Sequence, residues 1–129
     1  MPDAGDSFTI TLNTSHLRWG TFRYTNTRNR IYGEGYIPIP RRFARAFGIF
    51  NSNNHDANIR YNCTSTDGFY NGVLLAQGCS QAHDIYAKQF AEEGNLKGIG
   101  AWYAHVNARV GSHIRVTWTS PYDIVIEHF

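Results

Sequence analysis

Seven arginines gather between Arg18 and Phe47, in the stretch RWGTFRYTNTRNRIYGEGYIPIPRRFARAF. The stretch holds one acid, Glu34, so its net charge is +6 in a chain whose net charge is +2. A guanidinium group is a planar fork of hydrogen-bond donors that matches phosphate oxygens and the edge of guanine. The stretch therefore predicts a surface that contacts DNA.

This basic stretch divides into two predicted contact segments. The first, Thr21 to Arg30, is polar and free of proline and glycine, and it interleaves arginine with short amides and hydroxyls: Arg23, Thr25, Asn26, Arg28, Asn29 and Arg30. That mixture is typical of groups that meet base edges and phosphates, although a solvated loop is the alternative. The second segment is a helix predicted over 41–47, with Pro40 at its start and Gly48 at its end. Its three arginines, Arg41, Arg42 and Arg45, would lie near a positive helix end that suits a phosphate, or would simply face solvent.

A second polar region follows much later in the chain. Residues Gln77 to His83 are small and amide-rich, and they include Gln77, Ser80, Gln81 and His83. We interpret them as a second arm, with an ordinary connection between a strand and a helix as the alternative. Residues 84–90 predict the start of a short helix, on which Lys88 is the one basic side chain.

The rest of the sequence predicts the scaffold. Alternating apolar and polar residues favour strands over 8–12, 58–64, 69–77, 114–119 and 122–129, and the Asp67-Gly68 pair predicts a hairpin turn. Prolines restrict 36–40 to an edge strand or a strand end. A run of apolar residues at helical spacing predicts a helix that ends by Gly111 and places Trp102 in the core. The run consists of Leu96, Ile99, Trp102, Tyr103 and Val106. We expect one domain over 1–129, mainly β with short helices (α+β) and barrel-like, with residues 1–7 as a flexible tail.

Sequence patterns for catalysis do not occur in the chain. The six histidines show no HxH or HExxH spacing, and neither a GxSxG elbow nor a phosphate-binding loop is present. We therefore expect no catalytic residue, no metal and no cofactor. A small metal-dependent nuclease with a dispersed active site is one alternative, and a β module that binds sugar or protein is another.

Cysteine use and hydropathy indicate the cellular compartment. Cys63 and Cys79 have no metal-binding spacing, and we interpret them as free thiols of a reducing cytosol. The acidic N-terminal residues hold no signal-peptide core, and no apolar run approaches the ~20 residues that span a bilayer. The expectation is a cytoplasmic protein without a membrane partner.

Four stretches resemble a known family. They are LRWGTFR (17–23), EGYIPIP (34–40), CTSTDGFYNGVLLAQG (63–78) and VGSHIRVTWTSPYDIVIEHF (110–129). In this order they resemble the B3-like DNA-recognition domains of bacterial restriction endonucleases, especially the phospholipase-D-type nucleases, which are related to plant B3 domains. The resemblance implies a seven-stranded open barrel of the DNA-binding pseudobarrel type.

The resemblance also implies how such a domain works. Two arms would grip the major groove of double-stranded DNA: a first arm at 20–30 and a second arm at 77–83, with the helix arginines as phosphate clamps. The expected DNA-binding residues are Arg18, Trp19, Arg23, Thr25, Asn26, Arg28, Asn29, Arg30, Arg41, Arg42, Arg45, Gln77, Ser80, Gln81, His83 and Lys88. The implied function is sequence-specific, non-catalytic recognition, as the target-recognition module or subunit of a restriction-modification system. A reader of modified bases is a further alternative. The family's usual nuclease domain does not occur in this sequence, so a nuclease domain or subunit would be the partner.

Overall fold

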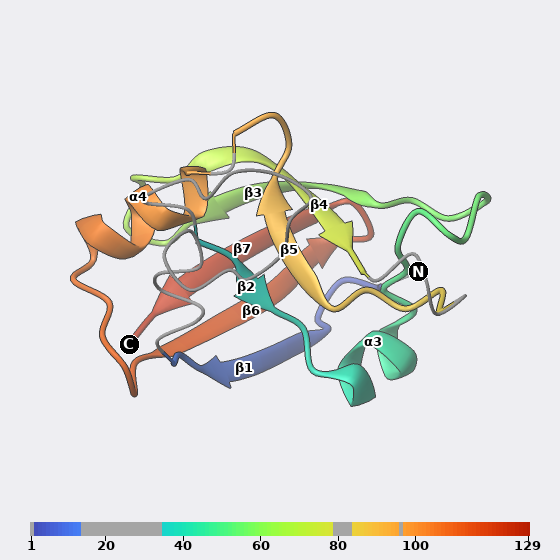
Figure 1. The fold of residues 1–129 in the computed structure, drawn as a ribbon, viewed down its shortest axis with the longest axis horizontal. Coiled ribbons are helices and arrows are strands. Elements are labelled where there is room, and N and C mark those ends of the chain that lie inside the picture. Colours follow the sequence, from blue (N-terminus) through green and yellow to red (C-terminus); the bar gives the residue numbers. More distant parts are fainter. Residues whose placement is uncertain (1, 14–34, 79–83, 96) are drawn as a thin grey trace, which may run out of the picture.

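The computed structural model of the chain describes residues 2–13, 35–78, 84–95 and 97–129. These residues form seven strands and two helices: β1 (Ser7–Thr11), β2 (Ile37–Pro38), α3 (Arg41–Phe47), β3 (Arg60–Ser65), β4 (Asn71–Gln77), β5 (Gln89–Glu92), α4 (Gly98–His105), β6 (His113–Ser120) and β7 (Asp123–His128). The strands make one sheet that curls into a nearly closed barrel (Figure 1). This confirms the predicted fold class, which is mainly β with short helices and barrel-like.

The order of strands in the sheet is β1-β6-β7-β3-β4-β5-β2. Strands β3 and β7 pair in parallel, and the other neighbours pair antiparallel. The two edge strands are β1 and β2. Pro38 lies in β2, as predicted, because a residue without a backbone N–H is tolerated at a sheet edge.

Alternating side chains fill the barrel. In β1, Phe8 and Ile10 are buried while their neighbours are exposed, and Tyr61 and Cys63 show the same alternation in β3. The inward residues of β6 and β7 complete the core: Ile114, Val116, Trp118, Ile124 and Ile126. Each fully buried apolar side chain of this size contributes about 1.5–3 kcal/mol relative to exposure.

The two helices lie at opposite ends of the barrel, which we call the α3 end and the α4 end (Figure 1). Helix α4 buries Ile99, Trp102 and Tyr103, which confirms the predicted helix and the core position of Trp102. The helix ends at His105, before Gly111. Asn107 adopts a left-handed φ of 55°, and the Ala108 N–H donates to the Tyr103 carbonyl at 2.9 Å. This left-handed helix stop, formed by asparagine, explains why the helix is shorter than predicted.

One predicted element is wrong. Residues 84–90 do not start a helix, because their backbone pairs with two distant segments. The Ala87 N–H donates to Ile49 O, after α3, at 2.9 Å, and the Lys88 N–H donates to Gln77 O of β4 at 2.7 Å. Phe90 then lies in β5, between β4 and β2, and is fully buried. Distant strand partners therefore decide the conformation of this segment. Neither helix of the described ranges has the length and apolar character that crossing a membrane requires.

Candidate nucleic-acid interface

Helix α3 forms where the sequence predicts it, over Arg41–Phe47. Pro40 precedes it, and Gly48 closes it with a left-handed φ of 71°, a conformation that glycine adopts without steric cost. Ala44 is fully buried. The ring of Phe43 stacks on Phe8 of β1, with centroids 5.6 Å apart. The apolar face of the helix is thus fixed against the barrel, and its arginines lie on the exposed face.

Arg42 and Arg45 are exposed, and no carboxylate of the described residues pairs with either. The Arg42 guanidinium lies 4.7 Å from the centroid of the Phe43 ring, and that of Arg45 lies 5.8 Å from the centroid of Tyr86. A guanidinium that lies over an aromatic face keeps its outer N–H donors free. The contact also restricts its rotamers before any ligand binds, so less side-chain entropy is lost on binding. Both groups are therefore ready to bind an anion.

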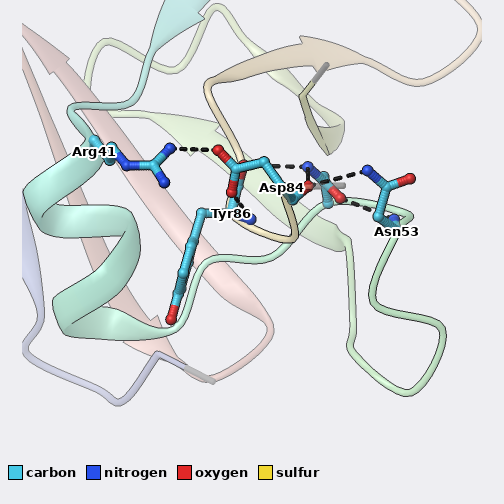
Figure 2. Close-up of polar contacts among 5 residues, drawn as sticks. Arg41, Asn53, Asp84 and Tyr86 are labelled. Carbon is cyan, nitrogen blue, oxygen red and sulfur yellow. Dashed lines mark hydrogen bonds and ion pairs between the residues drawn. The ribbon is translucent and has the colours of Figure 1, made fainter. Parts of the chain in front are cut away.

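Arg41 has a different environment from the other two arginines. Its Nη1 donates to Oδ2 of Asp84, from the segment that follows the second arm (Figure 2). This bond, with the bond from the Tyr86 N–H to Oδ1 at 3.0 Å, holds the pKa of Asp84 below its usual range. Arg41 is thus already neutralised by a protein carboxylate, and it ties α3 to Asp84.

The same segment is also held by two asparagines (Figure 2). Asn51 is 2% exposed, and its Nδ2 donates to the carbonyls of Asp84 at 2.8 Å and Tyr86 at 3.1 Å. Its Oδ1 accepts the Asn53 N–H at 2.8 Å, and Asn53 Nδ2 donates to Asp84 O at 3.0 Å. In the sequence, residues 51–56 (NSNNHD) have only the composition of a polar loop. A run of amides next to the apolar Ile49 and Phe50 was the one available signal.

Lys88 and Gln77 lie beside each other at the α3 end, because their strands pair there. Lys88 is exposed, and its carbonyl accepts the Ile39 N–H at 2.8 Å, just before α3 begins. Gln77 is half-buried, and its Oε1 accepts from Gln89 Nε2 at 3.4 Å. The structure therefore places five predicted site residues around one end of the barrel: Arg41, Arg42, Arg45, Gln77 and Lys88.

The other predicted site residues lie outside the described residues. These are Arg18, Trp19, Arg23, Thr25, Asn26, Arg28, Asn29 and Arg30 for the first arm, and Ser80, Gln81 and His83 for the second. The topology still fixes where each arm is connected. Residues 14–34 join the edge strands β1 and β2, and residues 78–88 join β4 and β5, the neighbour of β2.

The strand register places the described starts of the two connections at different ends of the strands. Thr11, where β1 ends, pairs with His113 at the α4 end, whereas Gln77, where β4 ends, pairs with Gln89 at the α3 end. The first connection leads into the edge strand β2, and the second leads into β5, the neighbour of β2.

Two further observations concern other kinds of site. Within the described ranges, no group of three or more histidine, cysteine or acidic side chains could hold a metal ion. The tryptophans Trp102 and Trp118 are both buried, at 0% and 1% exposure, so neither offers a surface for stacking on a sugar. Cys63 is also buried, and burial raises the pKa of its thiol, with a smaller effect of the nearby Glu92 charge. A buried, protonated thiol is a poor nucleophile.

Comparison with protein-family models finds no match to the chain, and no curated protein matches it. The function is therefore inferred from the residues themselves, from the fold, and from the charges at the α3 end.

Proposed function

We propose that the protein is a sequence-specific reader of double-stranded DNA with no catalytic activity of its own. The observation that carries this proposal is the pair Arg42 and Arg45, exposed, held over aromatic rings and free of carboxylate partners among the described residues. Lys88 adds a third exposed positive charge at the same end. Three such charges are suited to the phosphate backbone of DNA, which contributes most of the salt-dependent affinity of such proteins.

The proposal assigns different roles to the helix and to the arms. Arg42, Arg45 and Lys88 would contact phosphates and fix the position of the protein on the duplex. Such contacts carry no sequence information. The bases would be read by the two arms, with arginine directed to guanine and amides such as Asn29 and Gln77 directed to adenine.

The barrel fold also supports the proposal, because it is the fold that the resemblance to B3-like domains implies. In this proposal the duplex lies beside β2 and β5, the strands into which the two connections lead. By the same resemblance, we propose that the domain serves as the target-recognition module or subunit of a restriction-modification system. A nuclease domain or subunit would then be the partner.

The test is selection from a randomised duplex library at about 150 mM salt, without magnesium, where non-specific binding is partly suppressed. We expect enrichment of a short motif, with weaker retention by the Arg42→Ala and Arg45→Ala variants. The matched control is Arg115→Ala, which removes an exposed arginine that is paired with Glu127 at 2.8 Å on the outer face of the sheet.

Each outcome of the selection has a distinct meaning. Retention without a motif would direct the next selection to a methylated library and to the reading of modified bases. The absence of retention in both libraries would refute DNA recognition. Cleavage of the retained duplex after magnesium is added would favour the nuclease alternative.

A further inference from the structure

The structure shows a feature that the proposed function does not use, namely the buried side chain of Asn51. This side chain lies between the two ends of the connection from β4 to β5. On one side its Nδ2 donates to the carbonyls of Asp84 and Tyr86. On the other side it touches Gly78, where a Cβ atom would meet Nδ2 at 2.4 Å and Cγ at 3.3 Å. One amide thus contacts both ends of the connection.

Gly78 fits this arrangement because it has no side chain. An added methyl group at Gly78 would also meet the Tyr86 carbonyl at 3.1 Å. Contacts below 3.0 Å require a neighbour to move, and the nearest neighbour is the amide that holds Asp84 and Tyr86. The hydrogen bonds of Asn51 therefore depend on the absence of a side chain at Gly78.

The backbone around Asn51 pairs with the same connection. The Asn51 N–H donates to Ile85 O at 2.8 Å, and the Ala87 N–H donates to Ile49 O at 2.9 Å. Asp84 in turn accepts from Arg41, and the Tyr86 ring lies under Arg45. Asn51 therefore connects the ends of the second arm to the arginines of α3.

We infer that Asn51 is a positioning residue, which holds Gly78 and Asp84 so that the two described ends of the second arm, with Gln77, and the α3 arginines meet one duplex in a fixed relation. This inference rests on the proposed function. It predicts that loss of the Asn51 donors lowers the discrimination between DNA sequences more than it lowers affinity for DNA in general. The reason is that base contacts need exact placement of the arm, whereas phosphate contacts by Arg42 and Arg45 tolerate small shifts.

Three variants test the inference. Asn51→Asp keeps the shape of the side chain but replaces the Nδ2 donor with an oxygen that faces two carbonyls. Gly78→Ala keeps Asn51 and displaces its amide. Asn54→Ala is the matched control, because Asn54 belongs to the same loop but, among the described residues, its Oδ1 accepts from within that loop, from the Asp56 N–H at 3.3 Å.

The first readout is the dissociation constant for a scrambled duplex divided by that for the selected duplex, a ratio that measures discrimination. We expect this ratio to fall about tenfold in Asn51→Asp and in Gly78→Ala, the loss of about one well-placed base contact, and to stay unchanged in Asn54→Ala. The double variant should lose little more than either single variant, because both act on one amide. An unchanged ratio in Asn51→Asp and Gly78→Ala, with normal folding by circular dichroism, would refute the inference.

The second readout does not depend on DNA. Amide hydrogen exchange should become faster at Ala87 and Lys88 in Asn51→Asp and Gly78→Ala, and should be unchanged in Asn54→Ala. If the wild-type protein shows no sequence preference, the proposed function fails. In that case, unchanged exchange in the two test variants would also refute the positioning role of Asn51. Faster exchange would show that Asn51 holds the segment of Ala87 and Lys88, independently of any role in DNA binding.

Discussion

At the α4 end of the barrel one carboxylate connects a turn and a helix, whereas at the α3 end one amide connects two loops. Asp67, in the turn between β3 and β4, accepts from Ser65 Oγ at 2.7 Å, from the Phe69 N–H at 2.8 Å and from Trp102 Nε1 at 2.9 Å. Asn51 instead donates to carbonyls 33 and 35 residues away. The Asp67 site is largely local in sequence, and the Asn51 site depends on distant segments.

The charges of the two sites differ as well. Asp67 is an acid whose hydrogen bonds come from neutral donors, and it secures Trp102 of the core. Asn51 is neutral, and the segment that it holds carries the Tyr86 ring, over which the exposed Arg45 guanidinium lies. Contacts at the α4 end thus secure a core residue, whereas the α3 end presents exposed positive charge to solvent. Substitutions at the two ends should therefore affect different measurements.

The largest expected effect is on stability, from Trp102→Ala. Trp102 is fully buried, and removal of a buried tryptophan ring costs about 3–5 kcal/mol of the free energy of unfolding. Trp102→Phe keeps most of the ring and loses mainly the bond to Asp67, so its cost should be about 1 kcal/mol. Urea denaturation measures both values. If Trp102→Ala lost less free energy of unfolding than Trp102→Phe, the assignment of Trp102 to the core would be contradicted.

The next effect is on DNA affinity, from the double variant Arg42→Ala/Arg45→Ala. Two lost phosphate contacts should reduce the slope of log affinity against log salt by about 2, with weaker binding to every sequence. The free energy of unfolding should change by less than about 0.5 kcal/mol for each exposed position. Trp102→Phe provides the opposite control, because it should lower stability and leave the salt slope unchanged. A double variant with the wild-type slope would remove α3 from the interface.

Several features of both ends could be predicted from the sequence because their signals are local. Pro40 and Gly48 bracket α3 to the residue, and Asp67-Gly68 marks the turn between β3 and β4, where Gly68 has a φ of 80°. The prolines of the YIPIP segment placed β2 at an edge. Each of these follows from a backbone restriction that needs no tertiary partner.

Other features depend on partners far along the chain, and local reasoning missed them. Residues 84–90 were expected to start a helix, yet Phe90 pairs with Ala76 and Ile37 in the sheet. The ion pair between Arg41 and Asp84, which lies 43 residues later, also has no local signal in the sequence. Nothing at position 51 distinguishes the structural amide from its loop neighbours. The first arm, with most of the predicted base contacts, lies outside the described residues and stays a prediction.

Arg41 and Arg42 allow a narrower test, because the two neighbours differ in pairing. Arg42→Ala should reduce the salt slope by about 1, the value for one phosphate contact. Arg41→Ala should reduce it much less, because Asp84 already neutralises that guanidinium. Titration of one duplex at several salt concentrations measures both slopes. Equal reductions would show that Arg41 leaves Asp84 and contacts phosphate when DNA binds.

The smallest effect concerns the two carboxylates themselves, Asp67 and Asp84, whose pKa values both lie below the usual range. For Asp84 the main cause is the bond from Arg41. For Asp67, burial works against ionisation, but hydrogen bonds from Ser65, Phe69 and Trp102 outweigh it. Carboxyl-detected NMR titration should therefore show that Arg41→Ala raises the pKa of Asp84 and leaves that of Asp67 unchanged. Trp102→Phe should raise the pKa of Asp67 and leave that of Asp84 unchanged.

The sign of the linked stability follows from these directions. Because each folded-state pKa is lowered, the unfolded chain binds more protons below about pH 4, and stability falls as the pH drops from there through the folded-state pKa. Above that window each carboxylate contributes its full stabilisation. In Arg41→Ala the part due to Asp84 should shrink and the part due to Asp67 should persist. If Arg41→Ala shifted both carboxylates equally, the two ends of the barrel would be electrostatically coupled, and the separation of stability from binding would not hold.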